Sequence, residues 1–259
     1  MKKFSSLLVV LLLMLASLAA NAQDYPRGDV SQDGQVNITD VTCLIDYLLT
    51  GVWPEDPVTP PNEHEWVDLG LPSGTLWATC YVGANSPEEF GDYFAWGETE
   101  PKEVYDWASY KWCNGSASTM TKYCINSEFG YNGITDGKTE LDPEDDAAYV
   151  NWGEGWRMPT KEQLQELLEN CTWRWTQQNG VNGFLATGPN GNTIFFSAAG
   201  ARSDETILDP GSYGDFWSRT LSSHTCYAYD LAFNSESVSR YSGDRSFGRS
   251  IRAVRVSQE

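Results

Sequence analysis

Residue patterns that mark the common enzyme classes are missing from this chain. It contains only two histidines, His64 and His224, and its six cysteines include no Cys-x-x-Cys pair. No Gly-x-Ser-x-Gly, His-Glu-x-x-His or glycine-rich phosphate-loop motif occurs either. These absences argue against a zinc site, a Ser-His-Asp triad and a nucleotide-phosphate loop. We predict a non-catalytic protein, because abundant carboxylates do not by themselves define a glycosidase pair.

Basic residues are also scarce. Lys and Arg total 17 against 36 Asp and Glu, which gives a formal net charge of −19 at pH 7. Nucleic acids and anionic membrane surfaces select basic patches, so we predict neither as a partner. The acidic balance suits cation binding, or it simply keeps an exported protein soluble.

Long apolar runs are missing except at the start of the chain. There, two lysines precede the apolar stretch 7–18, and residues 20–22 (Ala-Asn-Ala) have the form of an Ala-x-Ala cleavage site. The run is too short to span a bilayer. We predict a signal peptide over residues 1–22, no transmembrane anchor, and an extracellular, cell-surface or periplasmic location.

Residues 29–40 match a calcium loop of about twelve positions. Gly34 at the sixth position permits the sharp turn, and a backbone carbonyl is available at the seventh. Calcium takes roughly six to eight oxygen ligands, which only a tightly looped chain brings together. An Asp- and Asn-rich turn is the alternative interpretation. The predicted calcium ligands are Asp29, Ser31, Asp33, Gln35, Asn37 and Asp40.

The same segment carries the motifs Gly-Asp-Val-Ser-Gln-Asp-Gly-Gln-Val-Asn-Ile-Thr-Asp-Val at 28–41 and Leu-Ile-Asp-Tyr-Leu-Leu at 44–49. It resembles a dockerin repeat, and the resemblance implies calcium binding over residues 23–51. Dockerins normally carry two such repeats and dock onto cohesin modules. One repeat is visible here, so a cohesin-like partner is left open. The Pro-rich acidic stretch 52–63 is typical of an extended linker.

The strongest helix pattern of the remaining domain, residues 64–259, follows Pro159. Thr160 is a good N-cap, and Gln163 completes a capping-box pattern. An apolar stripe at i, i+3, i+4 and i+7 is formed by Leu164, Leu167, Leu168 and Cys171. We predict an amphipathic helix that packs its apolar stripe on the sheets.

Short strands are predicted on both sides of this helix. Capped helix starts are predicted at 86–89 and at 142–149. Turn signals such as Asn-Gly and Asp-Pro-Gly separate the late strands. Helices early and hairpins late predict an α+β domain with short helices and antiparallel strands. The predicted strands are 66–69, 75–79, 92–97, 172–176, 183–187, 193–197, 216–221, 226–233, 237–241 and 251–256.

Several motifs follow one another along residues 64–259. They include Gly-Thr-Leu-Trp-Ala-Thr-Cys-Tyr-Val-Gly-Ala at 74–84, Gly-Asp-Tyr-Phe-Ala-Trp-Gly-Glu-Thr at 91–99, Trp-Arg-Met-Pro-Thr at 156–160, Glu-Asn-Cys-Thr-Trp at 169–173 and Gly-Arg-Ser-Ile-Arg-Ala-Val-Arg at 248–255. Together they resemble the Fibrobacter succinogenes major paralogous domain. The resemblance implies a C-type-lectin-like fold, similar to that of formylglycine-generating enzymes, in a secreted or surface protein without an established activity.

Two disulfides are predicted, because export permits them. Cys113 and Cys124 flank a short Gly/Ser-rich loop and form the local pair. The family resemblance implies a second disulfide between Cys80 and Cys171, since both stand in its motifs. The cysteines with no assigned partner, for which buried free thiols are the alternative, are Cys43 and Cys226.

The late strands and loops carry the candidate ligand-binding residues. Tyr, Trp and Arg dominate recognition surfaces, although alternate aromatics of a strand also form cores. Trp217 is predicted to lie in the core. The predicted binding residues are Tyr213, Arg219, Arg240, Tyr241, Asp244 and Arg245, the last four of them exposed.

These patterns predict a secreted binding module that recognises a glycan or a surface protein. The alternative is an accessory component of a polysaccharide-degrading assembly, anchored by the dockerin-like segment. A third possibility, an enzyme of another type, has no supporting motif.

Overall fold

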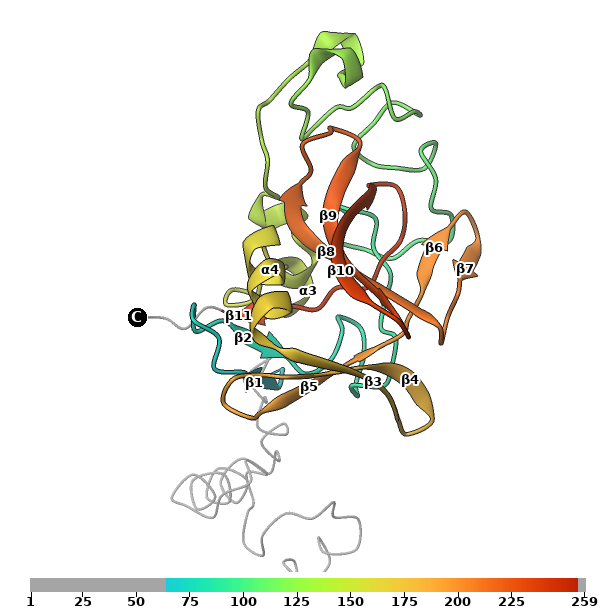
Figure 1. Ribbon diagram of the computed structural model, residues 1–259. Coiled ribbons are helices and arrows are strands. Elements are labelled where there is room, and N and C mark those ends of the chain that lie inside the picture. Colours follow the sequence, from blue (N-terminus) through green and yellow to red (C-terminus); the bar gives the residue numbers. More distant parts are fainter. Residues whose placement is uncertain (1–63, 256–259) are drawn as a thin grey trace, which may run out of the picture. The chain divides into compact units, whose positions relative to one another are not determined.

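The computed structural model describes residues 64–255 (Figure 1). The predicted signal peptide, calcium loop and linker lie outside the described residues, as do residues 256–259. Antiparallel β-sheet dominates the described part and helices are few, in agreement with the predicted α+β class.

The described strands pair into four small antiparallel sheets. The sheet β1-β2-β11 contains Trp66–Asp68, Leu76–Ala78 and Val254–Arg255. The sheet β3-β4-β5 contains Thr172–Gln178, Val181–Thr187 and Thr193–Ser197. The sheet β10-β9-β8 contains Val238–Asp244, Tyr227–Asn234 and Tyr213–Leu221. The hairpin β6–β7 contains Ala201–Ser203 and Thr206–Leu208.

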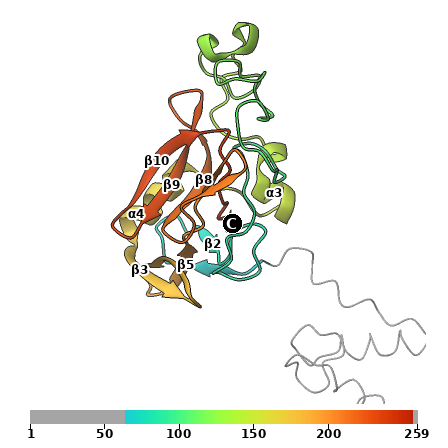
Figure 2. The ribbon, with the colours of Figure 1, turned by 90° about the vertical axis from the view of Figure 1, so that its right-hand side faces the viewer.

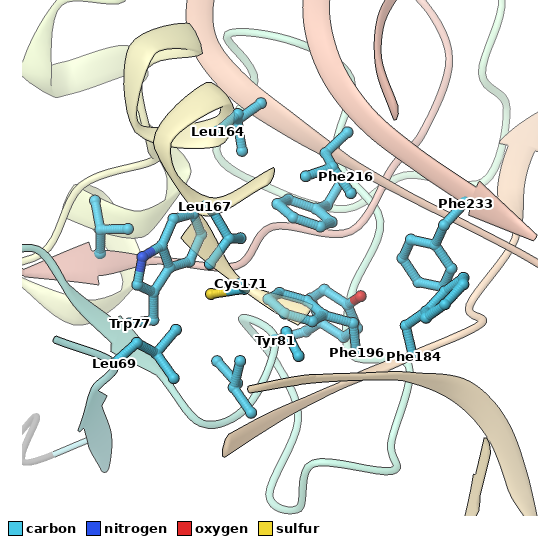
Figure 3. Packing of buried hydrophobic residues seen from close by; sticks show 14 of the residues in the cluster. Leu69, Trp77, Tyr81, Leu164, Leu167, Cys171, Phe184, Phe196, Phe216 and Phe233 are labelled. Atoms are coloured by element: carbon cyan, nitrogen blue, oxygen red, sulfur yellow. The ribbon is translucent and has the colours of Figure 1, made fainter. Parts of the chain in front are cut away.

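Helix α4 (Lys161–Asn170) confirms the predicted central helix. The Thr160 hydroxyl accepts a hydrogen bond from the Gln163 backbone N–H at 3.1 Å, and the Gln163 side chain accepts one from the Thr160 N–H at 2.9 Å. This capping box is worth about 1 kcal/mol of helix stability. Leu164 and Leu167 are fully buried against Trp77 and Phe216, as Figure 3 shows. The helix packs on β8, β9 and β10.

The β3–β4 hairpin confirms the predicted Asn-Gly turn. Asn179 and Gly180 both have positive φ, 49° and 86°, as a type I′ turn requires. The turn sets a register in which Trp175 faces Phe184, and their ring centroids lie 5.4 Å apart. The β6–β7 hairpin was missed, because its strands are short and its turn residue Asp204, with φ of 51°, offers no strong sequence signal.

The helix start predicted at 142–149 is split into two elements. Pro143–Asp145 forms a 3-10 turn, η4, and Asp146 then caps α3 (Ala147–Trp152) by accepting the Ala148 N–H at 3.0 Å. Two further 3-10 turns are η2 (Ser127–Phe129) and η3 (Tyr131–Gly133).

Two other predicted elements are wrong. Residues 92–97 form no strand, because their pairing with the C-terminal segment is limited to an isolated bridge between Phe94 and Arg249 and one hydrogen bond from the Trp96 N–H to the Arg245 carbonyl. Residues 86–89 form only a turn. The segment that follows, 98–141, contains few regular elements, and both views show its middle part beyond the end of β9 (Figure 2).

Neither predicted disulfide is present, since the five described cysteines are free thiols. Cys113 donates to the Trp107 carbonyl at 3.0 Å, and Cys124 donates to the Asn126 carbonyl at 3.2 Å, so each thiol is satisfied separately. Cys171 lies in the core below α4, whereas Cys80 is half-buried beside Thr79 outside that core. Cys43 lies outside the described residues.

Candidate functional site

The candidate site is built on the sheet β8–β9–β10 (Figure 1). Residues directly opposite each other on paired strands point to the same face. Tyr227 lies opposite Asp244, and Leu231 lies opposite Arg240, so these residues share one face with Tyr229. Helix α4 covers this face at Leu231 and leaves the tyrosines beyond its N-terminus. We call it the tyrosine face.

Two cations converge on Tyr229 at this face. The Arg240 guanidinium carbon lies 5.0 Å from the centre of the Tyr229 ring, and Lys161 Nζ lies 5.4 Å from it. Both distances are within the range of cation–π attraction. Arg240 forms no ion pair with any described carboxylate, and Lys161 has only the exposed Glu162, at 3.5 Å.

The aromatic side chains continue from Tyr229 toward the end of the sheet. The His224 ring stacks on Tyr227 with centroids 4.9 Å apart, and the Phe129 ring lies edge-on to His224 at 4.6 Å. Tyr227 is 37% exposed, and His224 is exposed as well. We call Tyr229, Tyr227, His224 and Phe129 the aromatic row.

The opposite face of the sheet carries a buried charge cluster. Arg249 Nε lies 2.5 Å from Oδ2 of Asp215, and Arg249 Nη1 donates to Asp230. The guanidinium stacks 4.0 Å from the ring centre of Trp217, which is fully buried as predicted. One oxygen of each carboxylate has no hydrogen-bond partner. One guanidinium thus faces two carboxylates in a buried site.

Burial raises the pKa of both carboxyl groups in this cluster. It raises the pKa of the Asp215 carboxyl well above its usual range, while Arg249 opposes the rise and Asp230 adds to it. Burial also raises the pKa of Asp230 against the effect of Arg249. A Cβ on Gly243 would collide with the Arg249 guanidinium, so the backbone of β10 packs directly against the guanidinium. The cluster is built as part of the core.

The six predicted binding residues do not form one site. Arg240 and Asp244 lie on the tyrosine face, Asp244 opposite Tyr227 and Arg240 beside Tyr229, and Arg240 is half-buried, not exposed as predicted. Tyr241 is 56% exposed but lies opposite Asp230, on the other face. Tyr213 and Asp244 are half-buried, and burial raises the pKa of both. Arg219 is paired with Glu140 at 3.2 Å.

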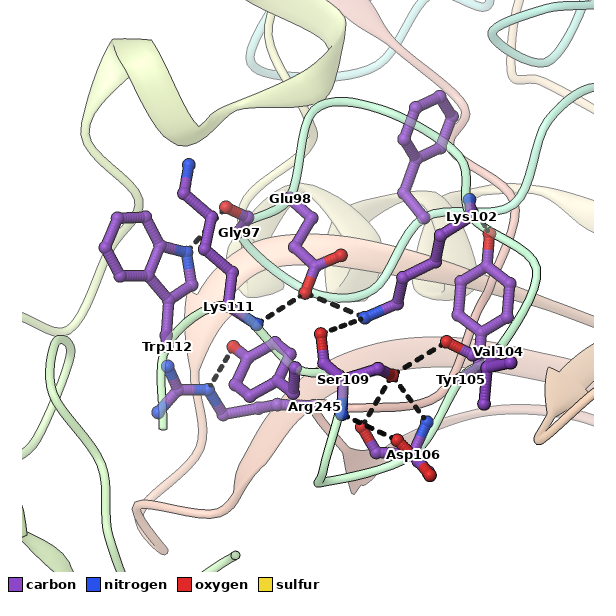
Figure 4. Close-up of polar contacts among 12 residues, drawn as sticks. Gly97, Glu98, Lys102, Val104, Tyr105, Asp106, Ser109, Lys111, Trp112 and Arg245 are labelled. Carbon is purple, nitrogen blue, oxygen red and sulfur yellow. Dashed lines mark hydrogen bonds and ion pairs between the residues drawn. The ribbon is translucent and has the colours of Figure 1, made fainter. Parts of the chain in front are cut away.

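The prediction that Arg245 is exposed is wrong, because its side chain is fully buried. Its Nε donates to the Tyr110 hydroxyl at 2.9 Å, as Figure 4 shows. Its other donors reach the carbonyls of Lys122, Tyr123 and Thr225 at 3.0–3.1 Å. These acceptors satisfy the guanidinium without a carboxylate, so Arg245 holds the segment 98–141 on the sheet.

Sequence reasoning missed Lys161 as a member of the site. The helix prediction already made Lys161 the first helical residue, directly after the Thr160 N-cap. Its proximity to Tyr229 depends on how α4 lies on the sheet, which periodicity does not specify. Tyr227 and Tyr229 were recognisable by their alternation along the predicted strand 226–233.

Comparison of this chain with known protein families, with curated proteins and with solved structures finds no match. Among the described residues, no group of three or more His, Cys, Asp or Glu side chains has a metal-binding arrangement. Within 64–255, none of the helices combines the length and apolar composition that crossing a bilayer requires.

Proposed function

We propose that this chain is an exported, non-catalytic binding protein whose larger domain, residues 64–259, binds a glycan along the aromatic row. The carrying observation is the line of partly exposed rings on one sheet face, from Tyr229 through Tyr227 to His224. Rings with an apolar body and a polar tip favour contact with ligands that are themselves partly apolar. Strands, which are more rigid than loops, hold both tyrosines.

The family resemblance supports the same proposal. A C-type-lectin-like arrangement, as in the Fibrobacter succinogenes major paralogous domain, fits a domain in which Trp-Arg-Met-Pro-Thr leads directly into the capped helix α4. In this proposal the helix supports the ligand face, since it packs on β8, β9 and β10 beside the tyrosines.

Affinity electrophoresis of the full chain in gels that contain plant or microbial polysaccharides tests the proposal. At least one polysaccharide should retard the protein. Tyr227→Ala should weaken that binding about tenfold, which corresponds to about 1.4 kcal/mol and lies within the range of a single aromatic contact. Tyr241→Ala is the matched control, because Tyr241 is exposed on the opposite face.

Two results would reject glycan binding at the aromatic row. One is the absence of retardation by any polysaccharide, which would shift the proposal to the protein-ligand alternative. The other is an equal loss of binding in Tyr227→Ala and Tyr241→Ala.

We also propose that residues 23–51 bind calcium, with Asp29, Asp33 and Asp40 as the carboxylate ligands. The support is the loop spacing alone, since these residues lie outside the described part. Calorimetric titration of the full chain with calcium should release heat that Asp29→Ala abolishes. Absence of heat from the unaltered chain would disprove the calcium loop.

A further inference from the structure

We infer that the Tyr229 end of the aromatic row binds an anionic group, the carboxylate or sulfate of an acidic glycan. The inference rests on the proposed function and adds a ligand class to it. It begins from three side chains on three elements: Lys161 from the start of α4, Tyr229 from β9 and Arg240 from β10. Their convergence places two positive charges at the surface of an acidic protein.

The backbones that carry these side chains are held in regular structure. The Lys161 backbone N–H donates to the Thr220 hydroxyl at 3.1 Å, next to the capping box of α4. The Tyr229 carbonyl accepts the Ser218 hydroxyl at 2.8 Å. Arg240 lies in the middle of β10, paired with Leu231. A ligand that binds here meets groups that are already in place, so little ordering is required.

Charge pairing distinguishes Arg240 from Arg219 and Arg249, and Arg245 differs from it because carbonyls and a hydroxyl already take its donors. Arg219 is paired with Glu140, and Arg249 is paired with two aspartates. Arg240 has no such partner among the described residues, so its planar donor pair is available to a carboxylate or sulfate. The one nearby pair, Lys161 with Glu162, is exposed and contributes little.

The aromatic row favours an acidic glycan over an acidic peptide as the ligand. Tyr227 is two residues from Tyr229 on one strand, so the two side chains repeat at about 6.6 Å along one face. A polymer of rings can place its acidic group between the cations and its next rings on Tyr227 and His224. An acidic peptide has no need of these rings, because its charge alone would hold it to Lys161 and Arg240.

Binding of the full chain to matched acidic and neutral glycans tests the inference. The probes are polygalacturonate, its fully methyl-esterified form, dextran sulfate and unsulfated dextran, with affinity measured by calorimetry at low and physiological salt. We expect tighter binding to one acidic probe than to its neutral partner, and the pair that differs tells carboxylate from sulfate. Arg240→Gln and Lys161→Gln should each reduce that affinity about tenfold and should reduce affinity for the neutral form less.

Arg174→Gln, on the exposed side of β3, is the matched control and should leave every affinity unchanged. Arg240→Lys, which keeps the charge and loses the planar fork, should fall between the unaltered chain and Arg240→Gln. Equal binding of acidic and neutral probes, with no effect of Arg240→Gln, would overturn the inference and leave the proposed function standing. Absence of binding to all glycans would overturn both, and so would binding of poly-glutamate alone.

Discussion

The two faces of the β8–β9–β10 sheet use the same residue types in opposite ways. On the tyrosine face, Arg240 lies over a partly exposed ring and has no carboxylate partner among the described residues. On the other face, Arg249 lies over the buried Trp217 and is paired with two aspartates. Both are arginine–aromatic contacts, and only the surroundings differ.

Burial explains the difference between the two arginines. A buried guanidinium must be paired and hydrogen-bonded, because losing its water is costly. The half-buried guanidinium of Arg240 keeps part of its water and can remain without a carboxylate partner until a ligand replaces that water. The comparison therefore separates residues that hold the fold from residues that are free to bind.

Removing the Arg249 guanidinium should have the largest effect on stability. In Arg249→Gln, Asp215 and Asp230 would be left buried without a positive charge, which should cost about 3–5 kcal/mol of unfolding free energy. Urea unfolding followed by tryptophan fluorescence measures this loss. Arg174→Gln should change stability by less than about 0.5 kcal/mol. A loss in Arg249→Gln as small as in this control would break the distinction between the faces.

The pH dependence of stability should show that folding raises the pKa of Asp215. Its pKa is raised in the folded state, so the folded chain binds more protons than the unfolded chain above pH about 4. The stability that Asp215 contributes therefore falls as pH rises from about 4 toward its folded pKa. In thermal unfolding, the chain should gain stability relative to Asp215→Asn as pH is lowered from 7 to 5. If the stability of the chain relative to Asp215→Asn falls as pH is lowered from 7 to 5, Arg249 keeps Asp215 ionised.

Substitutions on the tyrosine face should have the smallest effect on stability. Arg240→Gln removes one cation–π contact at a partly exposed ring and should cost less than about 1 kcal/mol. Urea unfolding measures it beside Arg249→Gln under the same conditions. A loss as large as that of Arg249→Gln would make Arg240 a structural residue and would remove the basis for placing a ligand there.

Local features of this fold were predictable from the sequence. The capping box of α4, its buried Leu164 and Leu167, and the Asn179-Gly180 turn each depend on residues within a few positions of one another. The core position of Trp217 was predictable for a similar reason, because it follows Phe216 in the middle of a predicted strand. Short-range chemistry specifies these features almost alone.

Features that depend on distant pairing were not predictable. Arg245 stands in a turn-rich, polar run, and its burial comes from carbonyls more than a hundred residues earlier in the chain. The segment 92–97 has a strand-like composition but pairs with the C-terminal segment only through an isolated bridge at Phe94 and one hydrogen bond at Trp96. The candidate site shows the same division: sequence suggests Arg240, and only the packing of α4 on the sheet adds Lys161.

The hydrogen bonds of Arg245 also set an order for folding. They connect Arg245 to Tyr110, Lys122 and Tyr123, so the shape of the segment 98–141 depends on a side chain near the end of the chain. Contacts of such wide sequence separation form late, because a long loop must close first. During synthesis, which begins at the N-terminus, the segment 98–141 therefore cannot form all of its native contacts until almost the whole chain has been made. The end of the aromatic row, where Phe129 meets His224, includes a residue of this segment.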